Sequence, residues 1–233
     1  MTQPPFETRE LRAKLQEYLN SKIDDLLSGK ARRLGSFKFG VYAFFDYDNE
    51  PIYVGQTAEG VSNRIGRHLT NQRTDAVAMK VLDPFEVFEV EVWPLPQYQG
   101  RSTGDPQARA HLNWLEYDIF QHFLGLSRFH AVLNEKNPLA FPAGFFERPQ
   151  GRRGCIVSEP VFALRSHPDT RIARRAETLS LLAKVISERQ VQKGLRRTLL
   201  TQTRRLAWLA EQRLEEFSGL PDETEEPEKS LDE

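Results

Sequence analysis

The spacing of apolar residues along the chain predicts a mixed α and β fold. Leucine and isoleucine recur every three to four positions over residues 8–28, as on one face of a helix, and Gly29 would end it. Aromatic and β-branched residues crowd 37–46 and 51–56, and apolar and polar residues alternate over 85–92. These three segments are therefore predicted strands.

Helices are expected between and after these strands. One is predicted over 60–71, and a second short one around 73–80. Asp105 followed by Pro106 has the residue types of an N-cap and a first helical position, so a helix should run from there to about Leu124.

The last third of the chain divides into two predicted parts. Residues 138–170 read as irregular, with one strand over 155–164, and 170–217 as helix, interrupted near Gly194. A leucine seam in this helical part fits either a short dimer-forming coiled coil or packing on the chain's own domain. The seam consists of Leu195, Leu199, Leu206 and Leu209.

The charged residues are segregated, although the net charge of the 233 residues is only -1. The last nineteen residues carry nine acidic side chains and one lysine, whereas residues 148–213 carry fifteen Arg or Lys and five Asp or Glu. This asymmetry indicates either a body that binds a polyanion or simply soluble, arginine-rich helices.

Composition also bears on location. No apolar run is long enough for a membrane span, and the first residues lack the layout of a signal peptide. Cys155 is the one cysteine, which excludes an internal disulfide and leads us to expect a cytoplasmic protein.

Two tyrosines occupy similar frames in the first two strands, Gly40-Val41-Tyr42 and Tyr53-Val54-Gly55. A four-residue connection would place Tyr42 opposite Tyr53, and any connection of even length would keep both on one face. The glycines would leave open backbone for a ligand to approach. Aromatic packing between strands is an alternative explanation of the pair.

Charged residues on two predicted helices are further candidates. Arg64 and His68 are four residues apart and share a helix face, which suits phosphate binding or proton transfer but is a weak signal alone. Glu116 is stronger, because it lies in the middle of the apolar stripe of its helix. A buried carboxylate needs a partner or a metal, and a structural salt bridge is the other explanation.

Taken together, these elements resemble the GIY-YIG nuclease superfamily. Gly40-Val41-Tyr42 corresponds to the first signature of the family and Tyr53-Val54-Gly55 to the second. The helix with Arg64 and His68 follows, then Glu116 on a later helix, and Asn134 at the asparagine that commonly closes the motif set.

The resemblance implies an α/β (α+β) fold with a three-stranded antiparallel sheet flanked by helices, and hydrolysis of phosphodiesters with one Mg²⁺ or Mn²⁺. By analogy, Glu116 would hold the metal, Tyr42 would act as general base or position the attacking water, and Tyr53 would bind the phosphate or water. Arg64 would stabilise the transition state, His68 would relay a proton or donate to phosphate, and Asn134 would orient this network or contact the nucleic-acid backbone.

One residue departs from the family pattern. Many members have a lysine after the second signature, where this chain has Gln56. That lysine can help to lower the pKa of a tyrosine, so its absence puts this assistance in doubt, and Arg64, Arg67 or the metal would have to compensate.

The domain organisation expected from these features has four parts. They are an N-terminal helical segment (1–35), the catalytic domain (36–137), a basic and mostly helical extension (138–217) and an acidic disordered tail (218–233). Beyond the catalytic set, we expect nucleic acid to contact four arginines, although the three in predicted loops could equally be exposed without such a role. The four are Arg67, Arg101, Arg152 and Arg153.

The expected function is that of a stand-alone endonuclease acting on DNA, double-stranded rather than single-stranded, in restriction or antiviral defence. A mobile-element (homing) endonuclease and a catalytically silent DNA-binding module are the alternatives. A homodimer is left open, and no membrane association is expected.

Overall fold

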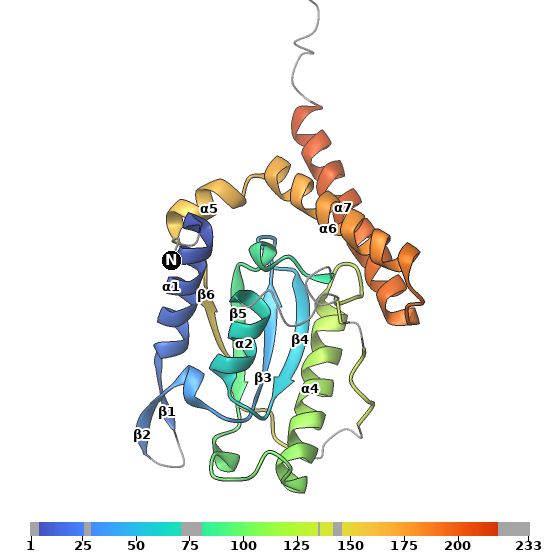
Figure 1. Cartoon of the computed structure of the whole chain (residues 1–233). Helices are drawn as coiled ribbons and strands as arrows, with labels where there is room; N and C mark the ends of the chain where they lie inside the picture. The colour runs from blue at the N-terminus through green and yellow to red at the C-terminus, as the bar shows by residue number, and fades with distance from the viewer. Residues whose placement is uncertain (1–4, 26–28, 71–80, 135, 142–145, 219–233) are drawn as a thin grey trace, which may run out of the picture.

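A central antiparallel sheet organises the protein (Figure 1). The computed structural model describes residues 5–25, 29–70, 81–134, 136–141 and 146–218. Strand β3 (Gly40–Phe45) lies between β4 (Pro51–Thr57) and β5 (Glu89–Pro94), and β6 (Arg152–Cys155) pairs with the far side of β5. The sheet order is therefore β4-β3-β5-β6, with β4 at the edge beside helix α4 (Pro106–Leu126).

The predicted α and β fold is confirmed, with one strand more in the sheet than expected. The three strands predicted over 37–46, 51–56 and 85–92 form as β3, β4 and β5, the last of which begins only at Glu89. The fourth, β6, is short and exposed, and it pairs Arg152 with Val92 and Cys155 with Glu89. The strand predicted over 155–164 was wrong, because Glu159–Arg165 form helix α5.

The N-terminal segment is only partly helical. Helix α1 spans Phe6–Asn20, and Lys22–Asp25 (β1) and Lys30–Arg33 (β2) then form a two-stranded antiparallel ribbon, so the helix predicted to residue 28 was too long. Beyond Asn20, Ile23 packs against the core from the ribbon. Gly29 has a φ of 63°. Glycine adopts this left-handed conformation at no steric cost.

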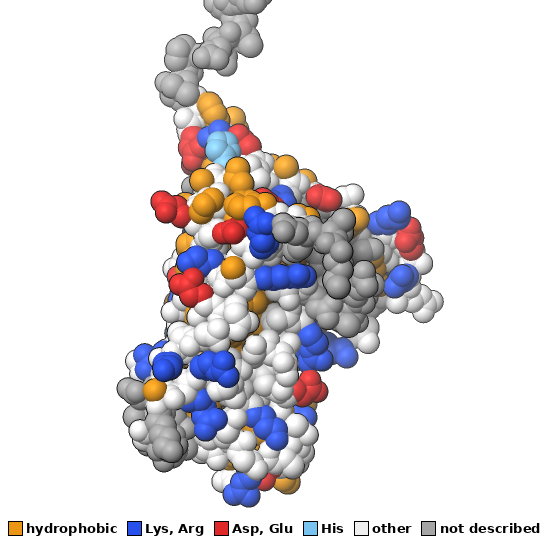
Figure 2. Space-filling model, turned by 60° about the vertical axis from the view of Figure 1, so that its left-hand side comes forward, with side chains coloured by type: hydrophobic (Ala, Val, Ile, Leu, Met, Phe, Trp, Pro, Cys, Tyr) orange, Lys and Arg blue, Asp and Glu red, His pale blue; other side chains and the backbone are white. Residues whose placement is uncertain are grey.

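Charge is dispersed over the face that Figure 2 shows. Lys and Arg side chains are scattered across its lower part, and hydrophobic side chains gather higher up. None of the helices in the described part of the chain is long and apolar enough to cross a membrane.

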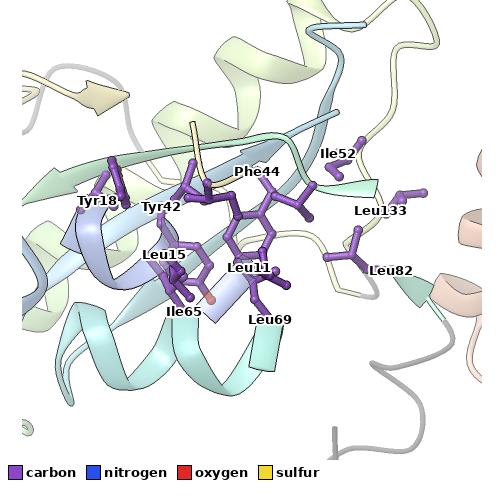
Figure 3. Packing of buried hydrophobic residues seen from close by; sticks show 14 of the residues in the cluster. Leu11, Leu15, Tyr18, Tyr42, Phe44, Ile52, Ile65, Leu69, Leu82 and Leu133 are labelled. Carbon is purple, nitrogen blue, oxygen red and sulfur yellow. The ribbon is translucent and has the colours of Figure 1, made fainter. Parts of the chain in front are cut away.

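Both faces of β3 are buried, so the sheet has a core on each side. Tyr42 and Phe44 point toward α1 and α2 (Val61–Thr70), where they pack among apolar residues of both helices (Figure 3). Val41 and Phe45 point the other way, into a second cluster with residues of α4. This alternation is that of a fully covered strand, and it fixes the direction of every side chain on β3.

Two long helices follow the strands of the sheet in the chain and lie side by side (Figure 1). They are α6 (Pro168–Glu188) and α7 (Lys193–Phe217), and a break at 189–192 replaces the interruption predicted near Gly194. Leu195 and Leu209 of the predicted seam are buried within the chain. The structure thus shows these seam residues packing on the chain's own domain.

A cluster of buried charges fixes this helix pair to the turn between β3 and β4. Arg175 and Arg205 each place a guanidinium nitrogen 2.7 Å from Asp46, and Glu86 lies 3.4 and 3.6 Å from the same two arginines. All four side chains are at most 3% exposed. The positive charge of Arg205, on an arginine-rich helix, is thus neutralised inside the protein.

Candidate active site

The two signature tyrosines lie on one face of the β3–β4 hairpin, but in a different register from the one expected. Tyr42 pairs with Gly55, and Phe44 with Tyr53. The register predicted from a four-residue connection was therefore wrong by two residues, whereas the shared face is confirmed. The connection is longer because Phe45 pairs with Pro51 across a bulge, and Asn49 turns the chain with a φ of 62°.

Gly55 makes room for the phenol of Tyr42. A Cβ atom added at Gly55 would lie 2.5 Å from the Tyr42 hydroxyl oxygen and 2.8 Å from Cε1 of Tyr53. Contacts this short do not occur between real atoms, so no other residue fits without moving the phenol. The glycine of the second signature thus allows the tyrosine of the first to reach the edge strand.

An aromatic cluster surrounds this phenol. The ring of Tyr42 lies 6.2 Å from Tyr53 and 5.9 Å from His68, measured between centroids, and Tyr53 lies 5.3 Å from His68. Phe44 contacts all three rings. Three of the predicted site residues are therefore gathered between the sheet and α2.

Glu116 is held at the same edge of the sheet from the opposite side. Nε2 of Gln56 on β4 donates to Oε2 of Glu116 at 2.7 Å and to Oδ1 of Asn113 at 3.0 Å. Asn113 precedes Glu116 by three residues on α4, so both lie on one face of that helix. The partner of the half-buried carboxylate is thus an amide; among the described residues, it forms no salt bridge with a cation.

The charges of these groups are coupled. Burial raises the pKa of Glu116, while the hydrogen bond from Gln56 and the positive charge of Arg64 oppose the rise. Burial also raises the pKa of Tyr42 well above that of a free phenol; neighbouring Tyr53 and Glu116 add to the rise, and Arg64 opposes it. Tyr42, Arg64 and Glu116 are therefore within electrostatic reach of one another.

Two buried polar atoms of this group, Nε of Arg64 and Oε1 of Gln56, lack a hydrogen-bond partner within the described part of the chain. The Tyr42 hydroxyl lies against the Arg64 guanidinium, whose hydrogen bond and positive charge both oppose the rise of the Tyr42 pKa. Buried polar atoms are normally paired, so unsatisfied ones call for a specific explanation. A polar ligand bound beside Glu116 would supply the missing hydrogen bonds, so the unsatisfied atoms indicate a ligand site.

Asn134 supports the edge strand. Its amide side chain accepts from the backbone N–H of Val54 at 3.1 Å and donates to the Val54 carbonyl at 2.7 Å. Val54 lies between Tyr53 and Gly55, so this pair of bonds fixes β4 where the site is formed. Asn134 is 5% exposed, and this geometry makes it a positioning residue.

The four arginines expected to contact nucleic acid lie in different settings. Arg67 is half exposed and pairs with Glu59 at 2.8 Å, and Arg101 is largely exposed, 3.6 Å from Asp105. Arg153 pairs with Glu89 at 2.6 Å and covers the ring of Phe45, so it stabilises the sheet. Arg152 is exposed. The structure does not bring these arginines into one group.

Sequence reasoning missed two contributors to the site. It treated Gln56 only as a replaced lysine, although Gln56 holds Glu116, and it did not identify Asn113 at all. A polar residue one turn before Glu116 was the available signal for Asn113. The involvement of Gln56 depends on strand register, which the sequence does not state.

The residues present suit one divalent ion with oxygen ligands. No group of three or more His, Cys, Asp or Glu side chains that could hold a metal occurs among the described residues. Mg²⁺ commonly keeps several waters and binds one or two carboxylates together with substrate phosphate. The Glu116 carboxylate, with its Oε2 fixed by Gln56, fits that requirement.

Comparison with models of protein families gives a match for the first part of the site. Residues 38–99 match the family model of the GIY-YIG catalytic domain. That segment includes both tyrosine frames, Gln56 and the helix with Arg64 and His68, and it ends before Glu116 and Asn134. Comparisons with curated proteins and with solved structures found no match.

Proposed function

Since the chain carries the catalytic domain of the GIY-YIG nuclease superfamily, we propose that it is a metal-dependent endonuclease that hydrolyses DNA phosphodiester bonds. We further propose that it acts on double-stranded DNA, in restriction or antiviral defence. The restriction or antiviral role is carried over from the resemblance to restriction-type members of the family.

One observation carries the proposal: three groups distant in sequence converge at the edge of β4. The Tyr42 phenol projects from β3 over Gly55 of β4. Arg64 is supplied by α2 and Glu116 by α4. A phenol, a guanidinium and a carboxylate around unsatisfied polar atoms can bind a phosphate and an oxygen-ligated cation. Any one of these three groups alone could be structural, but their convergence favours phosphodiester hydrolysis.

Glu116 is the residue that would hold a divalent ion. When bound, the ion would offset negative charge on the phosphate and the leaving oxygen. The hydrogen bond from Gln56 keeps one carboxylate oxygen in place, as outer partners of metal ligands commonly do. In this chain a neutral amide thus fills the position of the family's lysine and orients the acid.

Tyr42 acts best as a neutral hydroxyl. Its pKa is raised by burial, so the free protein holds the phenol protonated near neutral pH. A protonated phenol accepts a hydrogen bond from the attacking water and donates one to the phosphate, and so positions the nucleophile. Of the two roles expected from the resemblance, the raised pKa of Tyr42 favours positioning over general base in the free enzyme.

The remaining groups complete the phosphate site. Arg64 presents a half-buried guanidinium to the scissile phosphate, where it stabilises the charge that develops in the transition state. Tyr53 and His68 line the same aromatic cluster and supply hydrogen-bonding groups to the phosphate or water. Asn134 holds β4 so that Tyr53, Gly55 and Gln56 keep their places.

Cleavage assays with a matched variant test this function. Purified protein is incubated with supercoiled plasmid, linear duplex and single-stranded DNA in Mg²⁺ or Mn²⁺, and the same assays are run with Glu116→Ala. We expect the wild type to cut duplex DNA and the variant to bind it without cutting. If both proteins bind DNA and neither cuts any substrate, the chain is a silent DNA-binding module.

A further inference from the structure

The basic region from Arg148 to Arg213 separates into two groups once its ion pairs are known. Nine of its cations lie within 4.0 Å of a carboxylate: Arg148, Arg153, Arg165, Arg171, Arg174, Arg175, Lys184, Arg205 and Arg213. The positive charge of this group is therefore already compensated by the protein.

The remaining cations of this region have no carboxylate partner among the described residues, and most of them lie at the start of helix α7. Apart from Arg152, they are Arg189 and four residues of α7: Lys193, Arg196, Arg197 and Arg204. Residues 193–210 contain no Asp or Glu. Net charge is thus concentrated in the first four to five turns of this helix.

The four α7 cations share its outer side. The buried residues of the helix include Leu195, Thr198, Gln202, Arg205 and Leu209, which define its inner face. At about 100° per residue, Lys193, Arg196, Arg197 and Arg204 fall on the opposite side, and all four are exposed. We call these four residues the α7 basic face.

The α7 basic face begins next to the candidate active site. A guanidinium nitrogen of Arg197 donates to Oδ1 of Asn137 at 2.7 Å and to the backbone oxygen of Asn134 at 3.4 Å. The side chain of Asn134 in turn forms two hydrogen bonds with the backbone of Val54, which lies between Tyr53 and Gly55. Both acceptors are neutral, so Arg197 connects α7 to the site while keeping its charge.

From this arrangement we propose that the α7 basic face binds the phosphate backbone of the nucleic acid whose scissile phosphate occupies the site. The inference rests on the proposed function. Lys193 and Arg204 are eleven residues apart, about 16 Å along a helix, over which one strand of duplex DNA carries about five phosphates. Contacts of this kind set position and affinity without reading sequence.

Salt dependence of binding tests the proposal, because each phosphate contact contributes to its slope. Arg196→Ala/Arg204→Ala removes two uncompensated charges. The matched control, Arg148→Ala/Arg213→Ala, removes two arginines that carboxylates already neutralise. Affinity for a fluorescent duplex is measured by anisotropy from 50 to 300 mM NaCl, with EDTA present so that nothing is cut.

We expect the slope of log K against log salt to fall by about 1.8 in the first variant, or about 0.9 for each lost contact, and to stay unchanged in the control. Arg196→Lys/Arg204→Lys keeps the charges and should retain the slope. Equal slopes for wild type and Arg196→Ala/Arg204→Ala, or an equal fall in the control, would overturn the proposal.

The outcome separates this proposal from the function on which it rests. If the wild type cuts DNA while the Arg196→Ala/Arg204→Ala variant keeps full affinity and slope, the nuclease function is supported and DNA binding by the α7 basic face is refuted. If the slope falls as expected while the wild type cuts no substrate, the face binds nucleic acid in a protein that is not a nuclease.

Discussion

Replacing Gly55 by alanine isolates the contact that lets Tyr42 reach the edge strand. The added methyl group would lie 2.5 Å from the Tyr42 hydroxyl oxygen and 2.7 Å from Cζ of the same ring. Tyr42 is fully buried, so the ring has little freedom to move away. The phenol or the strand must shift.

The magnitude follows from overpacking and from misplacement of a reacting group. Inserting a methyl group into a packed core costs about 1–3 kcal/mol, which for a protein of this size lowers Tm by about 2–4 °C per kcal/mol. A misplacement of about 1 Å at a reacting centre lowers the rate roughly a hundredfold. Gly55→Ala should therefore lose far more activity than stability.

Single-turnover cleavage, DNA affinity and thermal unfolding measure these effects separately. We expect a cleavage rate about two orders of magnitude lower, near-normal DNA affinity and a Tm lower by several degrees. Gly125→Ala on α4 is the control, because open space surrounds Gly125 and the change should leave activity intact. A Gly55→Ala enzyme that unfolds at a lower Tm but cleaves at the wild-type rate would refute the reasoning.

Three further predictions concern the supports of the site. Asn134→Ala leaves the buried N–H and C=O of Val54 without hydrogen-bond partners, which costs about 1–3 kcal/mol for each group. The free energy of unfolding measured in urea should fall by that amount, and a variant as stable as the wild type would contradict the role of Asn134. Burial raises the pKa of Asp46, but the positive charges of Arg205 and Arg175 outweigh burial and lower the pKa overall. The stabilisation that these ion pairs give the folded protein should therefore be complete above about pH 4 and disappear as the pH falls through the lowered pKa. Asp46→Asn should accordingly cost about 3–5 kcal/mol at pH 7 and about 1 kcal/mol less at pH 3, as read from urea denaturation at each pH, because the stabilisation begins to fall only below the ordinary pKa of aspartate. Asp169→Asn should change little at either pH; a loss from Asp46→Asn that does not shrink at pH 3 would exclude the ion pair as the cause. Because burial raises the pKa of Tyr42, Tyr42→Phe should leave the ultraviolet titration of the tyrosines between pH 9 and 11 unchanged. An ionisation in that range that is lost in the variant would show a depressed pKa of Tyr42 instead.

Local patterns were enough to predict the elements of the catalytic region. The three strands and the helix with Arg64 follow from residue spacing over short stretches, and Glu116 stood out because a carboxylate interrupts an apolar stripe on its own helix. These predictions depend on neighbours within one turn or one strand, where periodicity is a reliable guide.

Predictions that required partners distant in sequence did less well. Strand β6 pairs with β5 about sixty residues earlier, and its Arg-Arg-Gly-Cys sequence has no strand pattern of its own. Arg205 reads as a surface cation until Asp46 and Glu86 are known to face it. The register that joins Gln56 to Glu116 depends on a bulge in the hairpin, which residue type alone did not indicate.

The central claim is that Tyr42, Arg64 and Glu116 act on one phosphate as a unit. Single-turnover cleavage of one duplex by the wild type, Tyr42→Phe, Glu116→Ala and the double variant tests this most directly. Groups that act together lose activity non-additively, so the double variant should cleave no more slowly than the slower single variant. If the two losses multiply in the double variant, the phenol and the carboxylate work independently and the claim is wrong.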